Sequence, residues 1–580
     1  MNRTVVRSLA LFVAPIVAGV LTTGVADAAP KKKKPADNDM TFEVDSVGPG
    51  EGAPPPTSGK PASSKPAAPP AGMSVKKSKP ADNKPAGAAS KTLERALKLY
   101  DTEDYAMSSI ELNKVIEGQT KDDEANKQRA EFFMGKALFN MKYYSASLSY
   151  FDRIVQKGPE HRYYGKTLQW LASLSRFLPE SAGVLEKIGV YTRQDLEQPA
   201  LEPVRDELYY LLGRFHYAKG HFKDAIDLFA AVPQKSEFFP KAKFFEGITY
   251  VRENKGKEAS DSFKAILRKV KEYDDPKKVP KVLREFEELA NLSLGRVFYT
   301  TRQWLQSIKY YEKLPQLSPD WLASLFEASW AYYQMDGDSK ALGNIHSVNS
   351  PFFENEFYPE AYILKAVIYF NRCNFDRSRE AIDEFNNIFP HLKKELDEVL
   401  AKYPDNAQFY DYVIKVRSGE AGLGKRVQRA AAGALSDRTL VKTIEYVNEL
   451  DRELQSLEKA DPAWKSTAVA GNILQDLTLQ KSLAANEAGQ LARTRLQRLT
   501  REIQDLIKQS IKVEYETLNA LKGSLTAGLI GDQANVNPNA KVVNRIVIDD
   551  EHYQWPFEGE YWKDELGYYR FKVSNKCEKK

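Results

Sequence analysis

The chain has 580 residues, of which 42% are hydrophobic and 28% are charged, so it carries enough apolar material for several cores or one long repetitive core. The net charge is only +5, and basic residues alternate with acidic ones outside one lysine-rich stretch near the start. These values argue against a single compact domain and predict no surface dedicated to nucleic acid.

Residues 1–28 have the composition of a secretory signal peptide. The opening MNRTVVR carries two arginines, the apolar run SLALFVAPIVAGVLTTGV follows, and Ala26-Asp27-Ala28 forms a small-x-small cleavage site. An uncleaved anchor is the alternative, because the run approaches the length that spans a bilayer. Pro15 and Gly19 inside the run favour removal after Ala28. Since no second long apolar run follows, we expect an exported chain with no integral membrane span after cleavage.

Residues 29–90 are rich in proline, alanine and lysine, and such a segment cannot bury enough apolar surface to order itself. We expect a disordered tether that its prolines keep partly extended. One island, Met40–Val47 (MTFEVDSV), alternates apolar with polar residues, which suits a strand added to the sheet of another protein. A chance apolar patch in the linker is the alternative, and it is favoured.

A period of 34 residues is the strongest pattern in the chain. Gly213, Ala225 and Phe229 recur as Gly247, Ala259 and Phe263, each 34 positions later. Further copies of the small-residue frame occur at Gly135 with Ser147, Gly295 with Ser307, Ser329 with Ala341, and Ala366 with Ser378. Small residues at two fixed points let two antiparallel helices approach closely, while large residues between them fill the gaps between neighbouring hairpins.

This unit resembles the tetratricopeptide repeat (TPR), a helical hairpin of 34 residues. The resemblance covers residues 91–410, with six clear units, two degenerate units near Leu93–Gly118 and Tyr163–Tyr191, and one unit lengthened by the stretch between Lys264 and Leu289. It implies a mostly α-helical protein with a TPR-like solenoid. In this family the first helices of the repeats line a concave groove that binds the ligand.

The residues expected to face the groove lie three before, one after and four after the small residue at each helix crossing. Aromatic and arginine side chains are enriched among them, as in protein-binding hot spots. Burial between adjacent repeats is the alternative for each position. The Lys/Asn pattern with which chaperone-type TPR domains bind a C-terminal carboxylate is absent. The candidate groove residues are Phe132, Phe139, Tyr210, Arg214, Tyr217, Arg296, Tyr299, Phe326, Trp330 and Tyr333.

Residues 411–525 lose the repeat frame and show two amphipathic stretches. Leucine, isoleucine and valine recur at spacings of three and four from Leu440 to Leu457 and again from Leu496 to Leu506. This spacing predicts an antiparallel helical, coiled-coil-like hairpin. The alternative is that these stripes extend the core of the solenoid.

Residues 526–580 form a tail that is rich in aromatic side chains. The segments EYW and YYRFKV on either side of a KDELG turn predict a small β-hairpin, pinned onto the helical hairpin or the last repeat because an isolated hairpin is marginal in water. The alternative is a patch that binds a partner or stacks on the sugars of peptidoglycan or another glycan. The rings concerned are Trp555, Phe557, Tyr561, Trp562, Tyr568 and Tyr569.

The segment YQWPFEGEYWKDELGYYRF also resembles the tails of large TPR proteins of the bacterial cell envelope, including those linked to gliding motility. This resemblance implies a periplasmic scaffold within a multi-protein complex. Two functions follow from the sequence: a scaffold that holds protein partners in its groove, or an envelope module that binds glycan through its aromatic tail.

No motif for catalysis, cofactor binding or metal binding is present. The chain lacks a nucleophile elbow, a phosphate-binding glycine loop and an HExxH helix, and its six histidines show no metal-ligand spacing. The sequence therefore predicts a non-enzymatic protein without cofactor or metal.

The two cysteines are Cys373, in a turn of the last clear repeat, and Cys577, after the aromatic tail. An exported chain meets oxidising conditions, so an intramolecular bridge is one outcome. Two thiols that stay free, or pairing with another chain, are the alternatives.

Overall fold

The computed structural model describes residues 87–353, 356–530 and 559–577. The expected signal peptide, the linker up to residue 86 and the Met40–Val47 island lie outside these residues. In the described ranges the chain is built from helices and contains no strand. None of these helices combines the length and the apolar character that are needed to cross a bilayer.

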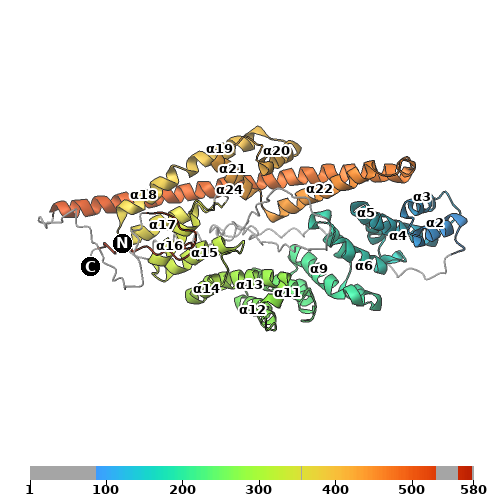
Figure 1. The fold of residues 1–580 in the computed structure, drawn as a ribbon, viewed down its shortest axis with the longest axis horizontal. Helices are drawn as coiled ribbons and strands as arrows, with labels where there is room; N and C mark the ends of the chain where they lie inside the picture. The colour runs from blue at the N-terminus through green and yellow to red at the C-terminus, as the bar shows by residue number, and fades with distance from the viewer. Residues whose placement is uncertain (1–86, 354–355, 531–558, 578–580) are drawn as a thin grey trace, which may run out of the picture.

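Seven regular helical hairpins run from residue 91 to residue 386 and form a helical repeat solenoid (Figure 1). The hairpins are α2 (Lys91–Asp101) with α3 (Tyr105–Ile116), α4 (Glu124–Asn140) with α5 (Tyr144–Lys157), α9 (Arg205–Ala218) with α10 (Phe222–Ala230), α11 (Phe239–Arg252) with α12 (Gly256–Val270), α13 (Lys281–Thr300) with α14 (Trp304–Tyr311), α15 (Trp321–Gln334) with α16 (Asp338–Val348), and α17 (Glu360–Asn371) with α18 (Phe375–Asn386).

Between α5 and α9 lies a less regular unit. It contains η2 (Gly158–Glu160), α6 (Tyr164–Leu174), η3 (Glu180–Ala182), α7 (Val184–Ile188), α8 (Arg193–Leu196) and η4 (Pro199–Val204). The first of the two units predicted as degenerate is a regular hairpin, α2 with α3, and the second is this interrupted one. The stretch between Lys264 and Leu289 becomes the end of α12, the turn η5 (Pro276–Lys278) and the first turns of α13.

The small residue at each crossing allows the two helices of a hairpin to touch. A Cβ atom added at Gly135, Gly213, Gly247 or Gly295 would lie 2.5–2.8 Å from the aromatic ring sixteen residues later, on the second helix. Four hairpins add the same hydrogen bond, from a serine hydroxyl on the second helix to the carbonyl of the crossing residue, at 2.7–3.0 Å. The predicted spacing of small residues is therefore the spacing of direct helix contacts.

The turn inside each hairpin also repeats. Seven positions after every crossing residue the backbone is left-handed, with φ between 55° and 77°. Glycine adopts this conformation without steric cost, yet six of the seven turns use another residue, because the two helices fix the turn geometry. These residues are Glu103, Lys142, Gly220, Asn254, Arg302, Asp336 and Cys373.

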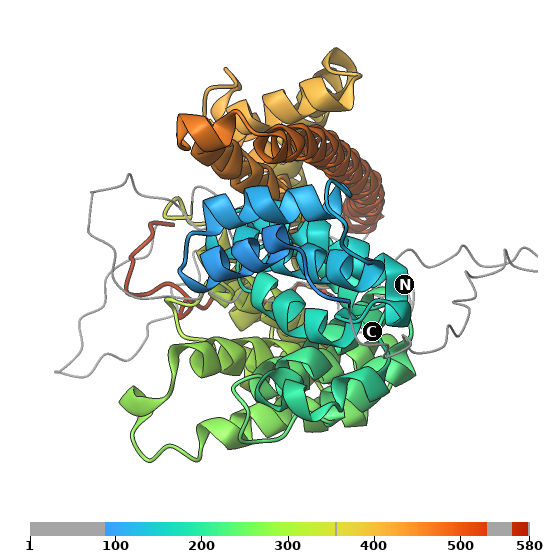
Figure 2. The same ribbon diagram turned by 90° about the vertical axis from the view of Figure 1, so that its right-hand side faces the viewer.

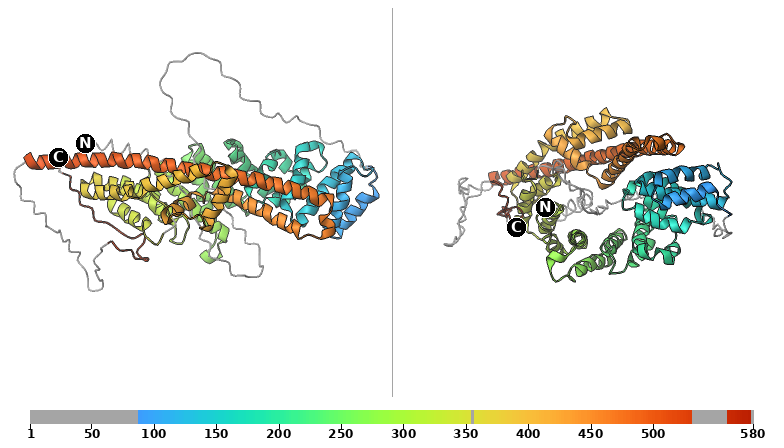
Figure 3. Two further views of the ribbon diagram at one scale, coloured as in Figure 1. Left: turned by 90° about the horizontal axis from the view of Figure 1, so that it is seen from above. Right: turned by 45° about the vertical axis from the view of Figure 1, so that its right-hand side comes forward.

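The chain then continues through α19 (Phe389–Lys402), α20 (Asn406–Ser418), α21 (Lys425–Ala434), α22 (Arg438–Glu458) and α23 (Pro462–Lys465) into α24 (Ala468–Ile530). Helix α24 has 63 residues, which makes it about 95 Å long. Seen from above, it runs along most of the molecule (Figure 3). In the end view it lies on the opposite side from the hairpins between α11 and α14 (Figure 2).

Helices α22 and α24 pack against each other and connect the two ends of the solenoid. Near its start, α24 shares a core with the first hairpins, where Trp464, Ile473 and Leu477 lie buried with residues of α2 to α5. Farther along, Leu496 and Ile503 lie buried in a second core with α17 to α21. The two amphipathic stretches thus extend the core of the solenoid, and the helices form a closed cycle of packed neighbours (Figure 1).

The β-hairpin expected within residues 560–573 is absent from the described tail, residues 559–577, which form a turn followed by irregular chain. The tail bonds to helices in place of a partner strand: Phe571 N–H donates to the carbonyl of Ser339, and Lys576 N–H to the carbonyl of Arg372. The segment VVNRIVI, residues 542–548, whose β-branched residues also favour a strand, lies outside the described residues.

Candidate functional site

The ten candidate groove residues do not form one exposed face, because their exposure depends on their place relative to the crossing residue. All positions three residues before the crossing are buried, including Phe132, Tyr210 and Phe326. Phe132, for example, packs edge-on to Phe151 with ring centroids 6.0 Å apart. For these three residues the expectation of an exposed groove is wrong, since they fill the space beneath the neighbouring repeat.

The arginines one residue after the crossing are held in internal networks. Arg214 is 7% exposed; it pairs with Glu180 at 2.6 Å and stacks over the ring of Phe245 at 4.1 Å. Arg296 donates two hydrogen bonds through its guanidinium to the carboxylate of Glu327. The third large residue at this position, Trp330, is 4% exposed. Because these side chains are committed to internal contacts, they are not available as a ready-made hot spot.

The positions four residues after the crossing stay accessible in every hairpin. Here the first helix ends, and each side chain lies beside the turn, where neighbouring repeats cover it only in part. Five of these positions carry a ring that contacts a second ring five residues later, at centroid distances of 4.9–6.0 Å. The accessible residues are Tyr100, Phe139, Tyr217, Val251, Tyr299, Tyr333 and Phe370.

A group of accessible rings lies on α2, on α4, on α6 and in the turn that follows α6, and we call it the N-terminal aromatic surface. Phe139 touches Trp170 at 5.3 Å and Phe177 at 5.6 Å, and Tyr100 touches Phe133 at 5.2 Å. Phe177 is 48% exposed and the other four rings are half-buried. Sequence reasoning found Phe139 but missed Tyr100, Phe133, Trp170 and Phe177, which lie off the three positions considered or in the degenerate units.

A lysine lies among these rings. The ammonium group of Lys136 is 4.5 Å from the ring centroid of Tyr100, 4.4 Å from that of Phe133 and 5.6 Å from that of Trp170. Burial lowers the pKa of Lys136, the charge of Lys166 lowers it further, and Asp101 opposes both effects. Neither Lys136 nor Lys166 forms an ion pair with a carboxylate of the described residues, so this surface offers rings together with positive charge.

The described part of the aromatic tail lies on α16. The ring of Tyr561 stacks on His346 at 4.1 Å, and Tyr569 meets the same histidine edge-on at 4.8 Å. Leu566 and Tyr569 are buried in the core that α15 to α17 share. Trp562 and Tyr568 stay exposed, at 50% and 77%, while Trp555 and Phe557 lie outside the described residues.

Glycine makes this docking possible. The backbone of Tyr569 runs directly over Gly343 in α16, where an added Cβ atom would overlap the Tyr569 carbonyl. The N–H of Gly567 donates to the hydroxyl of Ser347 at 2.8 Å. Gly343 and Ser347 lie one turn apart on the same face of α16. This face therefore holds the backbone of the tail as well as the aromatic rings of the tail.

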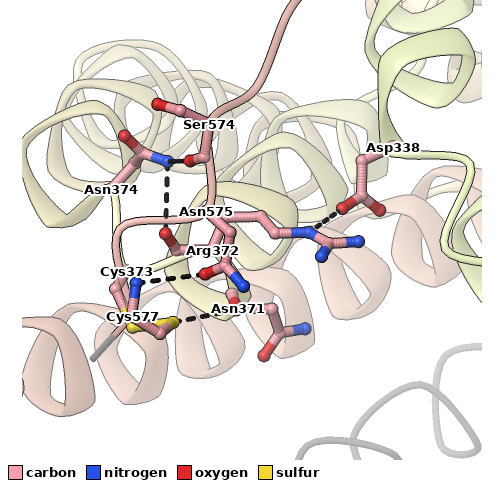
Figure 4. Close-up of a disulfide and its surroundings, with 8 residues drawn as sticks. All are labelled: Asp338, Asn371, Arg372, Cys373, Asn374, Ser574, Asn575 and Cys577. Atoms are coloured by element: carbon pink, nitrogen blue, oxygen red, sulfur yellow. Dashed lines mark hydrogen bonds and ion pairs between the residues drawn. A yellow bond between two sulfur atoms is a disulfide. The ribbon is translucent and has the colours of Figure 1, made fainter. Parts of the chain in front are cut away.

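A disulfide joins Cys373 and Cys577, whose Cα atoms are 5.0 Å apart across a sequence separation of 204 residues (Figure 4). Cys373 occupies the left-handed turn position between α17 and α18. Next to it, Asn374 donates through its side-chain amide to the carbonyl of Ser574 at 2.8 Å, and Arg372 pairs with Asp338 (Figure 4). The tail end is thus fixed at the last hairpin by a covalent bond and by hydrogen bonds.

Comparisons with known proteins add little to this geometry. No protein-family model matches the chain, and no curated protein matches it. Among solved structures it is similar to one described as "Circular tandem repeat protein with novel repeat topology and enhanced subunit contact surfaces", with 12% identity over 75% of this chain and 89% of that chain. The TM-score is 0.10, which does not establish a shared fold. The helical repeat solenoid is read from the chain's own helices.

Proposed function

We propose that the protein is a non-enzymatic TPR scaffold of the bacterial cell envelope, exported to the periplasm, that binds protein partners within a multi-protein complex. The observation that carries this proposal is the N-terminal aromatic surface with Lys136 at its centre. The envelope and the periplasm follow from the signal sequence and from the resemblance of the tail to envelope TPR proteins.

The composition of this surface suits an extended peptide segment with aromatic or aliphatic side chains and at least one acidic residue. Rings that already pack edge-on to one another lose little conformational entropy when a ligand covers them. An ammonium group that is partly desolvated gains from an incoming carboxylate more than one in open water does. Phe177 supplies an exposed ring and Lys136 supplies the positive charge.

A photo-crosslinking experiment tests this function. A benzophenone side chain replaces Phe177 in one version of the full chain and Leu305, 54% exposed on α14, in a matched version. Crosslinked segments from envelope extracts are identified, and a synthetic peptide of that sequence is titrated into the unmodified chain. We expect position 177 to capture a segment that position 305 does not.

The affinity of the chain for this peptide then tests the roles of Phe177 and Lys136. The double variant Phe177→Ala with Lys136→Glu should bind the peptide more weakly by at least about 2 kcal/mol, roughly thirtyfold. The control pair Leu305→Ala with Lys309→Glu truncates an exposed apolar side chain and reverses a lysine charge on α14, and it should leave the affinity unchanged. Equal affinities for both pairs, with intact circular dichroism, would reject this surface.

Binding of peptidoglycan or another glycan through the tail is the second candidate, favoured by the exposure of Trp562 and Tyr568. These rings are amphipathic and exposed, which suits stacking on sugars. Cosedimentation with purified cell-wall sacculi separates the two functions. Loss of sedimentation in Trp562→Ala with Tyr568→Ala, with peptide binding retained, would favour the glycan module.

A further inference from the structure

Three potential metal ligands meet at the turn between α9 and α10. The Nδ1 atoms of His216 and His221 are 3.4 Å apart, and Asp224 Oδ2 lies 4.0 Å from Nδ1 of His216. All three donor atoms lie within 4.8 Å of one another. Ligand atoms bound at about 2.0–2.1 Å around a tetrahedral zinc ion are themselves about 3.3 Å apart. Small side-chain rotations would therefore bring these donors to coordination distance.

The hairpin fold does not require this arrangement. The two histidines occupy the positions three and eight residues after the crossing residue Gly213. No other regular hairpin carries histidine at either position. The residues there are Leu99 and Asp104, Leu138 and Tyr143, Tyr250 and Lys255, Phe298 and Gln303, Tyr332 and Gly337, and Tyr369 and Asn374.

The backbone holds the three residues in place before any ion arrives. The N–H of His221 donates to the carbonyl of His216 at 2.9 Å, and Gly220 between them has φ +77°. Asp224 lies in the first turn of α10, three residues beyond His221. The contact of Gly213 with Phe229 locks the two helices. Preorganisation of this kind reduces the entropy that binding would cost.

The chemistry of the three donors suits a cation. A neutral imidazole offers a lone pair, and the carboxylate supplies negative charge. His221 and Asp224 are exposed, so the site is open to solvent.

The geometry points to a binding site for a divalent first-row transition metal ion, with His216, His221 and Asp224 as three ligands and one position left for water or for a side chain of a bound partner. Two histidines with one carboxylate are the donor set of open zinc and iron sites. Sequence spacing alone did not reveal the site, because a five-residue separation across a turn matches no helical metal motif. The alternative is that one imidazole donates a hydrogen bond to the other and that these residues bind no metal ion.

Isothermal titration calorimetry of Zn²⁺ into the tag-free full chain at pH 7.5 distinguishes a metal site from a hydrogen bond between the two imidazoles. We expect one Zn²⁺ per chain. The variants His221→Gln and Asp224→Asn replace exposed side chains, so the fold should persist, and each should lower the affinity at least about tenfold. His391→Gln removes an exposed histidine from α19 and should change nothing.

Either of two results would overturn the site. One is the absence of saturable Zn²⁺ binding by the unmodified chain. The other is equal Zn²⁺ affinity in the unmodified chain, in His221→Gln and in Asp224→Asn, which would place the bound ion elsewhere. Circular dichroism of each variant before titration confirms that a loss of binding reflects a lost ligand and not a lost fold.

Discussion

Glu360 shows at the scale of one residue how tightly the solenoid and the long helix pack. This glutamate begins α17 and is 5% exposed, and neither of its carboxylate oxygens has a hydrogen-bond partner among the described residues. Burial, together with the charge of Glu502 on α24, raises the pKa of Glu360 from 4.5 to about 8. The carboxyl group is therefore protonated at neutral pH, as a buried acid without a cationic partner must be.

A pH dependence of stability follows from this residue. The folded protein holds the proton up to about pH 8, whereas the unfolded chain releases it near 4.5. The contribution of Glu360 to stability is thus complete below pH 4.5, decreases as the pH rises, and is lost above about 8, a loss of roughly 4–5 kcal/mol. Glu360→Gln should raise the Tm at pH 8 and flatten its dependence between these limits, as calorimetry across the pH range would measure.

The exposed Glu395 on α19 provides the control for this measurement. Glu395→Gln makes the same substitution at an exposed position without removing a buried acid, so it should leave the slope of Tm against pH unchanged. A Glu360→Gln variant that keeps the slope of the unmodified chain would show that another group titrates in this window.

The tail illustrates what decides structure at the scale of one element. Its alternating aromatic residues favour a strand, but a hairpin of two short strands would leave one face of rings in water. Docking on α16 buries Leu566 and Tyr569 and satisfies backbone N–H groups with Ser339, Ser347 and Arg372. Tertiary contacts thus override the local preference.

The disulfide should control how often this element detaches. The tail buries only a few side chains, so without Cys373–Cys577 we expect it to open locally while the solenoid stays folded. Reduction should speed trypsin cleavage after Arg570 and Lys572 at least about tenfold, measured by mass spectrometry below the Tm. Cys577→Ser should show the fast cleavage without reductant. Identical cleavage rates before and after reduction would show that hydrogen bonds and ring contacts alone hold the tail.

At the scale of the whole molecule, α24 converts an open repeat array into a closed cycle. Open solenoids contact only sequence neighbours and bend readily along their length. Here Trp464, just before α24, is 3% exposed, donates its indole N–H to Ser109 at 3.0 Å and stacks on Tyr143 at 5.8 Å. The distant contact restrains the first hairpins relative to the last, which keeps the N-terminal aromatic surface in a defined place.

Trp464→Ala should open this closure at its N-terminal end. Loss of a buried tryptophan costs about 3–5 kcal/mol, and the first hairpins would then separate from α22 and α24. Small-angle X-ray scattering should show a larger radius of gyration, together with a lower Tm. Leu483→Ala, which removes a side chain 62% exposed on α24, should change neither quantity. A lower Tm with unchanged scattering would mean that the contact stabilises the molecule without determining its shape.

The sequence by itself determined the helical repeat. Small residues at fixed spacing mark where two helices touch, and this signal survives because hairpin contacts are local, within sixteen residues such as Gly213 and Phe229. It predicted three groove-facing positions in each first helix without distinguishing them, and the structure leaves the last of these, as in Phe139 and Tyr217, accessible in every hairpin.

Only the tertiary structure decided which of the other candidates were available. Arg214 and Trp330 have the composition of a binding surface but lie buried, because neighbouring repeats cover them. Contacts between residues 200 to 355 positions apart, such as Cys373 with Cys577 and Ser109 with Trp464, close the cycle and dock the tail. Such contacts depend on how all the hairpins stack together. The local spacing of residues in the sequence does not determine this stacking.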